Sequence, residues 1–286
     1  MRASLVALGI CTAATTAGAD TLTELSRFAW QFPAINGVSG LEVTDDGKRF
    51  IAVTDLGWRL EGEIARDGDA IFGVAVTAID PIRSKDTLPV AARRVGDWSD
   101  AEGLAIASDG TEYVSFERWA RVATFDGPNS PAKRIKDHPT FFELASNRQL
   151  EAIAIDSQGT IVTFPERPLE SGFPIFQLKN GAWSVSGYLP EADGFSIVGA
   201  DFDRGDKLYL LERKLQLGTW WRSRIRRVNL DGTEDVALWT SERDQFTNLE
   251  GISVWYDDQG LRLTLVSDNN RSTGEPTEFV EFRLTE

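Results

Sequence analysis

A short pattern that returns five times constrains the fold of this chain more than any other feature. In each copy an acidic residue lies in an apolar run, a glycine-containing turn follows, and a second acidic residue closes the next apolar run. The copies span residues 39–55, 101–118, 150–167, 199–213 and 249–270. Repetition at intervals of roughly fifty residues is typical of propellers and other closed arrays of one structural unit.

The segments around the repeats are typical of β-hairpins. Turn signals such as Asp126-Gly127 and Asn180-Gly181 separate short runs rich in apolar residues. A second, less regular hairpin is expected after each of the first four repeats, in residues 63–83, 121–135, 174–189 and 223–240. Two hairpins make a four-stranded sheet, which is the content of one propeller blade.

The fifth repeat is followed by a single strand, Thr277–Leu284, so Leu22–Phe32 is expected to supply the missing strand. The sequence therefore predicts an all-β protein, a β-propeller of five four-stranded blades whose ring is closed by the N- and C-terminal strands. Six blades are the alternative, since the interval between Glu42 and Glu102 is long enough to hide a degenerate unit. No segment resembles an interdomain linker, and residues 20–286 are expected to form a single domain.

The first nineteen residues are typical of a secretory signal. Arg2 precedes a short apolar stretch, and Ala17-Gly18-Ala19 fits a small-residue cleavage site. Cleavage near Ala19 would leave residues 1–19 behind and deliver a periplasmic or secreted protein. The single cysteine, Cys11, lies in this segment, so the mature chain would have neither disulfides nor thiolate metal sites.

The charge of the chain excludes one large class of partners. Its formal net charge is −14, whereas nucleic-acid binding depends on basic patches that neutralise phosphates. No later segment is long and apolar enough for a transmembrane helix, so membrane insertion is not expected. The chain is expected to be a monomer.

The repeated acidic residues are predicted to gather in one place. A hairpin reverses the chain, so a residue that begins its first strand and one that ends its second strand lie at the same end. This rule gives five pairs: Glu42 with Asp55, Glu102 with Glu117, Glu151 with Glu166, Asp201 with Glu212, and Glu250 with Asp268. If the first strands line the axis, the pairs converge at one mouth of the central channel.

Repulsion among so many carboxylates favours a bound cation. Two carboxylates about 5 Å apart repel by roughly 3 kcal/mol at an effective dielectric near 20. Calcium, or alternatively magnesium, takes oxygen ligands, and all ten paired acids are candidate ligands. The chain has one histidine, His138, so a nitrogen- or sulfur-rich zinc or copper site is not expected. The alternative is that these acids only form salt bridges between blades.

Three arginines each follow an acidic residue of the pattern. Arg118, Arg167 and Arg213 are candidates to hold an anionic substrate through forked hydrogen bonds. Neighbouring residues of a strand point to opposite faces, however, so each arginine is also a candidate to face away from the acid before it.

The ordered set of motifs resembles one known family. SGLE with TD, DAEGLA with FER, NRQLEAIA with FPER, GADF with LLER, and TNLEGIS with LVSDNN together span Ser39 to Asn270. They resemble the bacterial phytase-like family, also described by an esterase-like activity of phytase. The resemblance implies a secreted or periplasmic, calcium-dependent β-propeller with ester or phosphoester hydrolase activity. The fourth unit departs from the pattern, with Asp201 where other units have glutamate.

These observations predict a calcium-dependent hydrolase of phosphomonoesters or other small anionic esters. Glu102, Glu151 and Glu250 are the candidate catalytic residues, because a carboxylate of the ring is suited to accept a proton from the attacking water. Two alternatives stay open: a non-catalytic propeller in which metal fastens the blades and a loop face binds a ligand or protein, and a calcium propeller that hydrolyses lactones.

Overall fold

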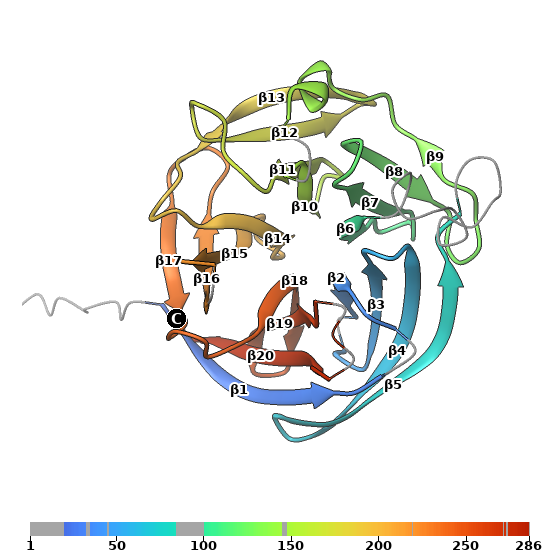
Figure 1. The fold of residues 1–286 in the computed structure, drawn as a ribbon, viewed down its shortest axis with the longest axis vertical. Helices are drawn as coiled ribbons and strands as arrows, with labels where there is room; N and C mark the ends of the chain where they lie inside the picture. The colour runs from blue at the N-terminus through green and yellow to red at the C-terminus, as the bar shows by residue number, and fades with distance from the viewer. Residues whose placement is uncertain are drawn as a thin grey trace, which may run out of the picture.

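The chain forms a ring of five antiparallel sheets, each with four strands (Figure 1). The computed structural model describes residues 20–285, except 33–34, 45, 84–99, 145–147, 219, 271 and 273. The all-β, five-bladed propeller is thereby confirmed, and the alternative of six blades is wrong. The predicted signal segment, residues 1–19 with Cys11, lies outside the described residues.

Each of the first four blades is built from consecutive strands. The first contains β2 (Val38–Val43), β3 (Arg49–Thr54), β4 (Trp58–Asp67) and β5 (Ala70–Pro81). The second contains β6 (Ala101–Ile106), β7 (Glu112–Phe116), β8 (Arg121–Phe125) and β9 (Lys133–Arg134). The third contains β10 (Leu150–Ile155), β11 (Ile161–Pro165), β12 (Phe173–Lys179) and β13 (Ala182–Leu189). The fourth contains β14 (Ser196–Phe202), β15 (Leu208–Gln216), β16 (Trp220–Val228) and β17 (Asp235–Thr240).

The fifth blade joins the two ends of the chain, as the sequence predicts. Its strands are β18 (Asn248–Asp257), β19 (Gly260–Asp268), β20 (Thr277–Thr285) and β1 (Thr21–Trp30), with β1 antiparallel to β20 along the outer edge. Arg27 of β1 reinforces the joint, since its Nε donates to Glu278 Oε1 at 2.7 Å. The backbone N–H of Ile71 also donates to Ser26 Oγ at 2.8 Å, which ties β1 to the first blade.

Apolar side chains fill the spaces between neighbouring blades. Between the fifth and first blades, for example, the rings of Phe50 and Phe279 meet edge to face with centroids 5.5 Å apart, and both residues belong to one buried cluster. Strand residues alternate between the two faces of a blade, so each sheet contributes to two such layers. This sandwiching fixes the blades relative to one another and leaves the inner strands around the axis.

The inner strands β2, β6, β10, β14 and β18 approach one another so closely that most need a glycine. A Cβ atom at Gly103 would lie 2.6 Å from the carbonyl oxygen of Glu151 in the next blade. One at Gly199 would lie 2.6 Å from the carbonyl oxygen of Glu250, and one at Gly251 equally close to that of Ser39. The glycine that follows the acidic residue in the repeat is therefore a packing requirement of the narrow ring.

Every inner hairpin also contains an irregularity at the same point. The pairing register shifts between Ala101 and Leu104 in β6, between Leu150 and Ile153 in β10, and between Leu249 and Gly251 in β18. Corresponding shifts occur in β2 and β14. A β-bulge re-aims the side chain that it contains, and here the bulged stretches contain Glu102, Glu151 and Glu250.

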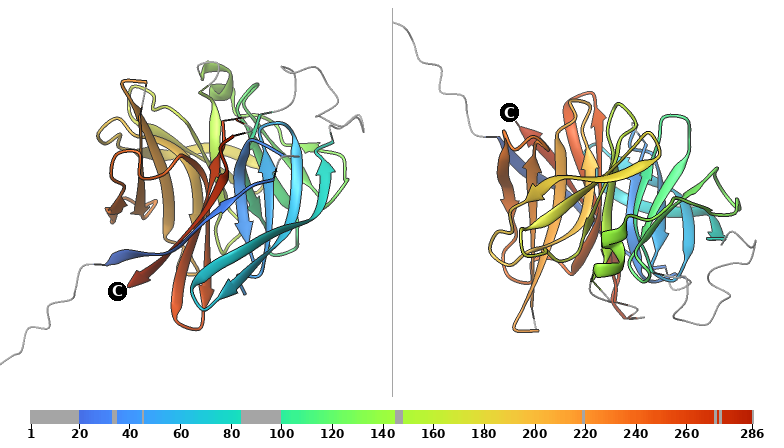
Figure 2. Two further views of the ribbon diagram at one scale, coloured as in Figure 1. Left: turned by 60° about the horizontal axis from the view of Figure 1, so that its bottom comes forward. Right: turned by 90° about the horizontal axis from the view of Figure 1, so that it is seen from above.

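The short 3-10 helix η2 (Pro139–Glu143) joins the second blade to the third and begins at His138, whose Nδ1 accepts the backbone N–H of Thr140 at 3.3 Å. Figure 2 shows η2, the short yellow-green coil, on the same side of the ring as the turn between β15 and β16. Among the described residues, no helix has the length and apolar character needed to cross a membrane.

Candidate functional site: an acidic cavity at one mouth of the channel

A cavity of about 270 Å³ opens where the inner strands begin. Seven carboxylates and one guanidinium line it, from Asp55, Glu102, Glu117, Glu151, Glu166, Glu250, Asp268 and Arg213. Four blades supply the acids, from the bulges of the first strands and the ends of the second strands. This is the convergence that the hairpin rule predicts, and it leaves a formal charge of −6, seven negative groups against one positive group.

Three of the carboxylates are close enough to share one ligand. Oxygen atoms of Glu117, Glu151 and Glu166 lie within 4.8 Å of one another. Two oxygens bound to the same Ca²⁺, at 2.3–2.6 Å each, are at most about 5 Å apart. The donor set is made of hard oxygen atoms, so the residues present fit a calcium or magnesium ion.

Burial and mutual repulsion hold these acids in an unusual protonation range. The pKa of Glu102 lies well above its usual value, because of burial first and then the charges of Glu151 and Glu250. Burial likewise raises the pKa of Glu151, against the opposing effect of Arg213. Burial and nearby carboxylates raise the pKa values of Glu117 and Asp268 to about 7. Keeping these carboxylates ionised without a bound cation therefore destabilises the folded protein.

Arg213 occupies the position where the fourth blade would place its second acid. Its Nη1 donates to Asn248 Oδ1 at 2.7 Å and to Glu250 Oε1, and its Nη2 lies 3.8 Å from Glu166 Oε1. Burial alone would lower the pKa of Arg213, but Glu250, Glu151 and Glu166 outweigh it and raise that pKa. Asn248 Nδ2 also donates to Glu250 Oε1 at 2.8 Å, so Glu250 is held by two donors.

Glu212 does not belong to this site, and its predicted pairing with Asp201 at the mouth is wrong. Its fully buried carboxylate lies inside the fourth blade, where Arg224 Nε donates to Oε2 at 2.5 Å and Arg226 Nη2 lies 2.8 Å from Oε1. Adjacent strand residues face opposite ways, so Arg213 reaches the cavity and Glu212 the interior of the blade. The residue at the cavity position of this strand is Arg213, one residue later than the acidic pattern predicts.

Glu42 and Asp201 are also placed elsewhere, and the predicted pairing of Glu42 with Asp55 is wrong. Glu42 lies opposite Ile51 in the β2–β3 ladder, three residues beyond the position that Glu102 occupies in its own blade. Asp201 holds the matching position in the fourth blade, where its Oδ2 accepts the N–H of Val254 at 2.6 Å. Burial, followed by repulsion from Asp201, raises the pKa of Glu42 well above its usual value.

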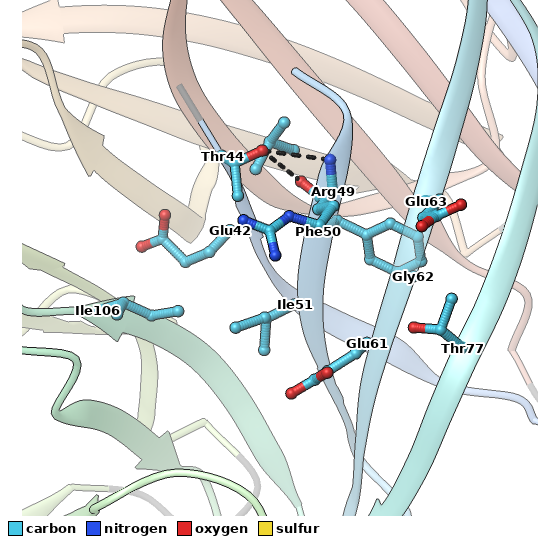
Figure 3. Close-up of a pocket in the computed structure, with 11 residues that line it drawn as sticks. Glu42, Thr44, Arg49, Phe50, Ile51, Glu61, Gly62, Glu63, Thr77 and Ile106 are labelled. Atoms are coloured by element: carbon cyan, nitrogen blue, oxygen red, sulfur yellow. Dashed lines mark hydrogen bonds between the residues drawn. The ribbon is translucent and has the colours of Figure 1, made fainter. Parts of the chain in front are cut away.

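Glu42 instead lines a second cavity of about 500 Å³ along the first blade (Figure 3). Figure 3 shows Glu42 beside Ile106 of the second blade, with Arg49 and Ile51 next to it and Glu61 below. Glu61 is already paired, at 2.7 Å from Arg59 Nη1. The structure therefore separates the ten predicted acids into seven at the mouth and three away from it.

The two remaining arginines lie at the edge of the acidic cavity. Arg118 follows Glu117 directly, and its Nε pairs with Asp100 Oδ2 at 2.9 Å while 43% of its side chain stays exposed. Arg167 follows Glu166, with its Nε 3.9 Å from Glu166 Oε1. Of the three arginines, only Arg213 enters the cavity lining.

Asp100 is a residue of this region that the sequence pattern did not reveal. It has a left-handed backbone with φ of 68°. Its N–H donates to Asp55 O at 2.7 Å, and its own carbonyl oxygen accepts the N–H of Glu117 at 3.0 Å. Asp100 thereby connects the second strands of the first two blades and supports two residues of the cavity. An acid just before the repeat, in Ser-Asp-Ala-Glu-Gly, was the available signal.

Comparison with known proteins gives a family over most of the chain. Residues 33–271 match the family described as "Phytase-like: Esterase-like activity of phytase". No curated protein sequence matches the chain significantly.

Among solved structures, the PQQ-bound aldose sugar dehydrogenase of Streptomyces coelicolor is similar, with 13% identity and a TM-score of 0.52 over 93% of this chain and 98% of that one. A gluconolactonase of Xanthomonas campestris has 13% identity and a TM-score of 0.44 over 86% of this chain and 72% of the other. At such identities the first likeness shows the fold alone, and the second is too weak to support a conclusion.

Proposed function

The chain belongs to the phytase-like family, and on that premise we propose that it is a divalent-cation-dependent hydrolase of phosphomonoesters or other small anionic esters. The observation that carries the proposal is the cavity of seven carboxylates around one arginine. Two carboxylate charges 4.8 Å apart repel by about 3.5 kcal/mol at an effective dielectric near 20. The cavity contains several such repulsive pairs, and either bound protons or a cation must offset their summed repulsion. Calcium has a coordination number high enough to bind several carboxylates at once.

Glu117, Glu151 and Glu166 would hold the cation, with Glu102, Glu250, Asp55 and Asp268 as further oxygen donors around it. A cation bound there supplies a Lewis acid that polarises the ester carbonyl or phosphoryl oxygen. Mg²⁺ would use fewer of these ligands and retain more water. The mature chain would offer no thiolate, because its single cysteine precedes the proposed cleavage point.

The protein's own groups then divide the work of hydrolysis. Glu102, Glu151 and Glu250 are the candidates to accept the proton of the attacking water, and a general base is most effective with a pKa near the working pH. Burial and repulsion raise the pKa values of Glu102 and Glu151 in the cation-free protein, and a bound cation would lower these pKa values again toward the ionised form that accepts a proton. Glu250 is already oriented by Arg213 and Asn248. The proton taken from water finally passes to the oxygen of the leaving alcohol.

Arg118 and Arg167 are suited to attract the anionic part of a substrate at the entrance, because both are partly exposed and each directly follows an acid of the cavity lining in the sequence. Arg213 would contact the same anion only by exchanging one of its present partners. In this division of roles, the rim recognises charge and the interior carries out the proton transfer.

A binding protein without catalysis is the second candidate, and one observation favours it. The cavity acids come from four different blades, so a bound cation would fasten the ring irrespective of any reaction. In that case removal of the cation would lower the melting temperature and change nothing else.

Metal analysis and a substrate panel test the proposal together. Purified protein is analysed for calcium and magnesium, then assayed with phenyl phosphate, phenyl acetate and a simple lactone, with calcium or with a chelator. The expected result is bound calcium and turnover of a phosphate or carboxylate ester that chelation abolishes. Lactone turnover alone would move the assignment to lactone hydrolysis.

Glu102→Gln combined with Glu151→Gln is expected to weaken calcium binding while the fold is kept. Glu112→Gln is the matched control, since Glu112 is a buried carboxylate that pairs with Arg59 at 2.6 Å outside the cavity. Unchanged calcium affinity in the double variant would refute the site. Retained calcium without turnover of any ester would leave the binding protein as the better description.

A further inference from the structure

The fourth blade projects beyond the mouth of the acidic cavity. Its inner strand β14 begins at Ser196, opposite Arg213 of the cavity lining, yet β15 continues for three more residues to Gln216. In the other four blades the second strand ends at the residue that lines the cavity or one residue before it. At about 3.3 Å per residue, the β15–β16 hairpin therefore rises about 10 Å above the mouth (Figure 2).

Two apolar side chains of this hairpin lie above Arg213. Leu215 and Trp221 are directly opposite each other in the β15–β16 register, and side chains at such positions have Cβ atoms about 5 Å apart. Because strand side chains alternate between faces, both belong to the face of the hairpin that carries Arg213. In agreement, the guanidinium of Arg213 lies over the Trp221 ring, 5.7 Å from its centroid. Leu215 and Trp221 are called here the apolar wall.

The charged side chains of the projecting hairpin lie on its other face or already have partners. Lys214 and Arg222 are opposite each other on the other face, and each donates to a backbone carbonyl oxygen. Asp244 lies beside the apolar wall, where its Oδ1 accepts the backbone N–H of Trp221 at 2.9 Å. Its Oδ2 lies 3.5 Å from Arg243 Nε. Among the described residues of the hairpin, the face above Arg213 therefore presents hydrocarbon over a charged base.

The apolar wall is accessible from the mouth of the cavity. Leu215 is 47% exposed and Trp221 is half-buried. Leu217, at the tip of the hairpin, is 90% exposed, so the apolar character continues to the end of the projection. Binding sites for small molecules commonly combine a few charged groups with apolar side chains that receive the rest of the ligand. The cavity supplies the charged groups, and the projecting hairpin supplies the apolar side chains.

We propose that the apolar wall binds the hydrocarbon part of an ester whose reacting group enters the acidic cavity. Arg213 connects the two regions, because it lines the cavity and contacts Trp221. An alkyl or acyl chain gains free energy by leaving water and needs no hydrogen-bond partner on the wall. The hydroxyl groups of a sugar would need such partners. The inference rests on the proposed hydrolase function, to which it adds the class of group next to the ester bond.

The test compares ethyl with hexyl phosphate and ethyl acetate with ethyl hexanoate, two pairs that each differ by four methylene groups. Wild type in calcium should prefer the longer member by about 15-fold in kcat/KM, roughly twofold for each half-buried methylene. Leu215→Asn and Trp221→Ala should reduce this preference below about fivefold, and Trp221→Phe should retain most of it. Phe72→Ala is the control with the full preference, because Phe72 is 64% exposed on β5 of the first blade.

Leu215→Asn is the decisive variant. Leu215 is exposed, so its replacement should keep the fold, whereas Trp221→Ala also removes a contact of Arg213. Equal losses on short and long esters in Leu215→Asn, an unchanged preference in that variant, or the same loss in Phe72→Ala would overturn the apolar wall. A higher kcat/KM for glucose 6-phosphate than for hexyl phosphate would overturn the hydrocarbon assignment.

Calorimetric binding of hexyl and ethyl phosphate, with calcium present, separates this inference from the hydrolase proposal. If wild type turns over none of the esters yet binds hexyl phosphate more tightly than ethyl phosphate, and Leu215→Asn loses the difference, the apolar wall stands and the hydrolase fails. Equal binding of the two phosphates by wild type would remove the wall. Binding of wild type, but not of Leu215→Asn, to phosphatidylcholine vesicles would then assign the hairpin to a lipid surface instead.

Discussion

Glu117→Gln should stabilise the protein when divalent cations are absent. Glu117 faces Glu151 and Glu166 within 4.8 Å, and Arg213 and Arg118 offset this repulsion only in part. The glutamine keeps the shape of the side chain and removes its charge. The same change should weaken calcium binding, because one proposed ligand loses its charge.

The magnitude follows from the pKa of Glu117, which burial and the neighbouring acids raise to about 7 from 4.5. A shift of that size corresponds to roughly 3 kcal/mol between the two protonation states. Glu117 is partly accessible to water, so screening reduces the figure to about 1.5 kcal/mol.

The sign of the pH dependence is fixed by proton linkage. The folded state holds the Glu117 proton more strongly than the unfolded chain does. The loss of stability caused by the ionised carboxylate is therefore absent below about pH 4.5 and complete above about pH 7. At about pH 8 in chelator, Glu117→Gln should therefore exceed wild type in stability, and at about pH 4.5 the two should be equal.

Urea unfolding in chelator and in excess calcium measures the effect. Calcium should reverse the order of the two proteins, since wild type gains more free energy from binding. The control is Glu112→Gln, which leaves the buried Arg59 without its bidentate partner and should cost about 3 kcal/mol with or without calcium. A Glu117→Gln protein that is less stable than wild type in chelator near pH 8 would refute the repulsion argument.

Three further changes test other parts of the structure. Glu212→Gln should cost about 3–5 kcal/mol in urea unfolding, because two buried arginines lose their common partner, while calcium affinity measured by titration stays the same. Gly103→Ala should cost about 1–3 kcal/mol and weaken calcium binding, since its Cβ would press on the backbone of Glu151 at 2.6 Å; normal stability would contradict the close approach of the inner strands. Trp119→Gly should be about 1 kcal/mol more stable than Trp119→Ala and should therefore melt at a higher temperature, because only glycine relieves the strain of the left-handed backbone at this position.

The number of blades could be predicted from the sequence because it depends on local signals. Turn residues and apolar runs mark each hairpin, and an unpaired strand at each end requires the ring to close between them. The observed pairing of β1 with β20 follows directly from that count. The convergence of Glu102, Glu151 and Glu250 was predictable for the same reason, since these residues hold one position in three copies.

The errors at Glu42, Asp201 and Glu212 are errors of register: Glu212 is one residue from the cavity position of its strand, and Glu42 and Asp201 lie three residues beyond the cavity position of theirs. A strand's faces alternate with every residue, so an alignment that is one residue off sends Glu212 into the blade and Arg213 into the cavity. The bulge at the start of each inner hairpin shifts the register at the very position that matters. Neither a turn residue nor the alternation of apolar residues in the sequence marks that bulge. Its effect on side-chain direction is therefore visible only in the structure.

Most of the Glu-Gly motif is explained by packing rather than chemistry. The glycine admits the neighbouring backbone, and only the glutamate lines the cavity. The third blade has Ala152 in place of the glycine, which shows that the requirement is for a small residue. A search for the same site in other propeller sequences should therefore compare the glutamate of the motif and the residue at the end of the second strand, and not the glycine.

The joint between the ends of the chain bears on how the protein matures. Arg27 and Glu278, which meet across this joint, are 251 positions apart in sequence, and contacts of such separation form slowly. Until β20 is made, β1 has no strand to pair with, and an uncovered β20 is an edge that the β1 of another copy can occupy. Strand exchange between molecules is thus the characteristic misassembly to expect. Asp55 follows β3 of the first blade and Asp268 ends β19 of the fifth, and both line the acidic cavity. A cation bound there would hold these two blades together and so keep β20 beside the β1 of its own chain.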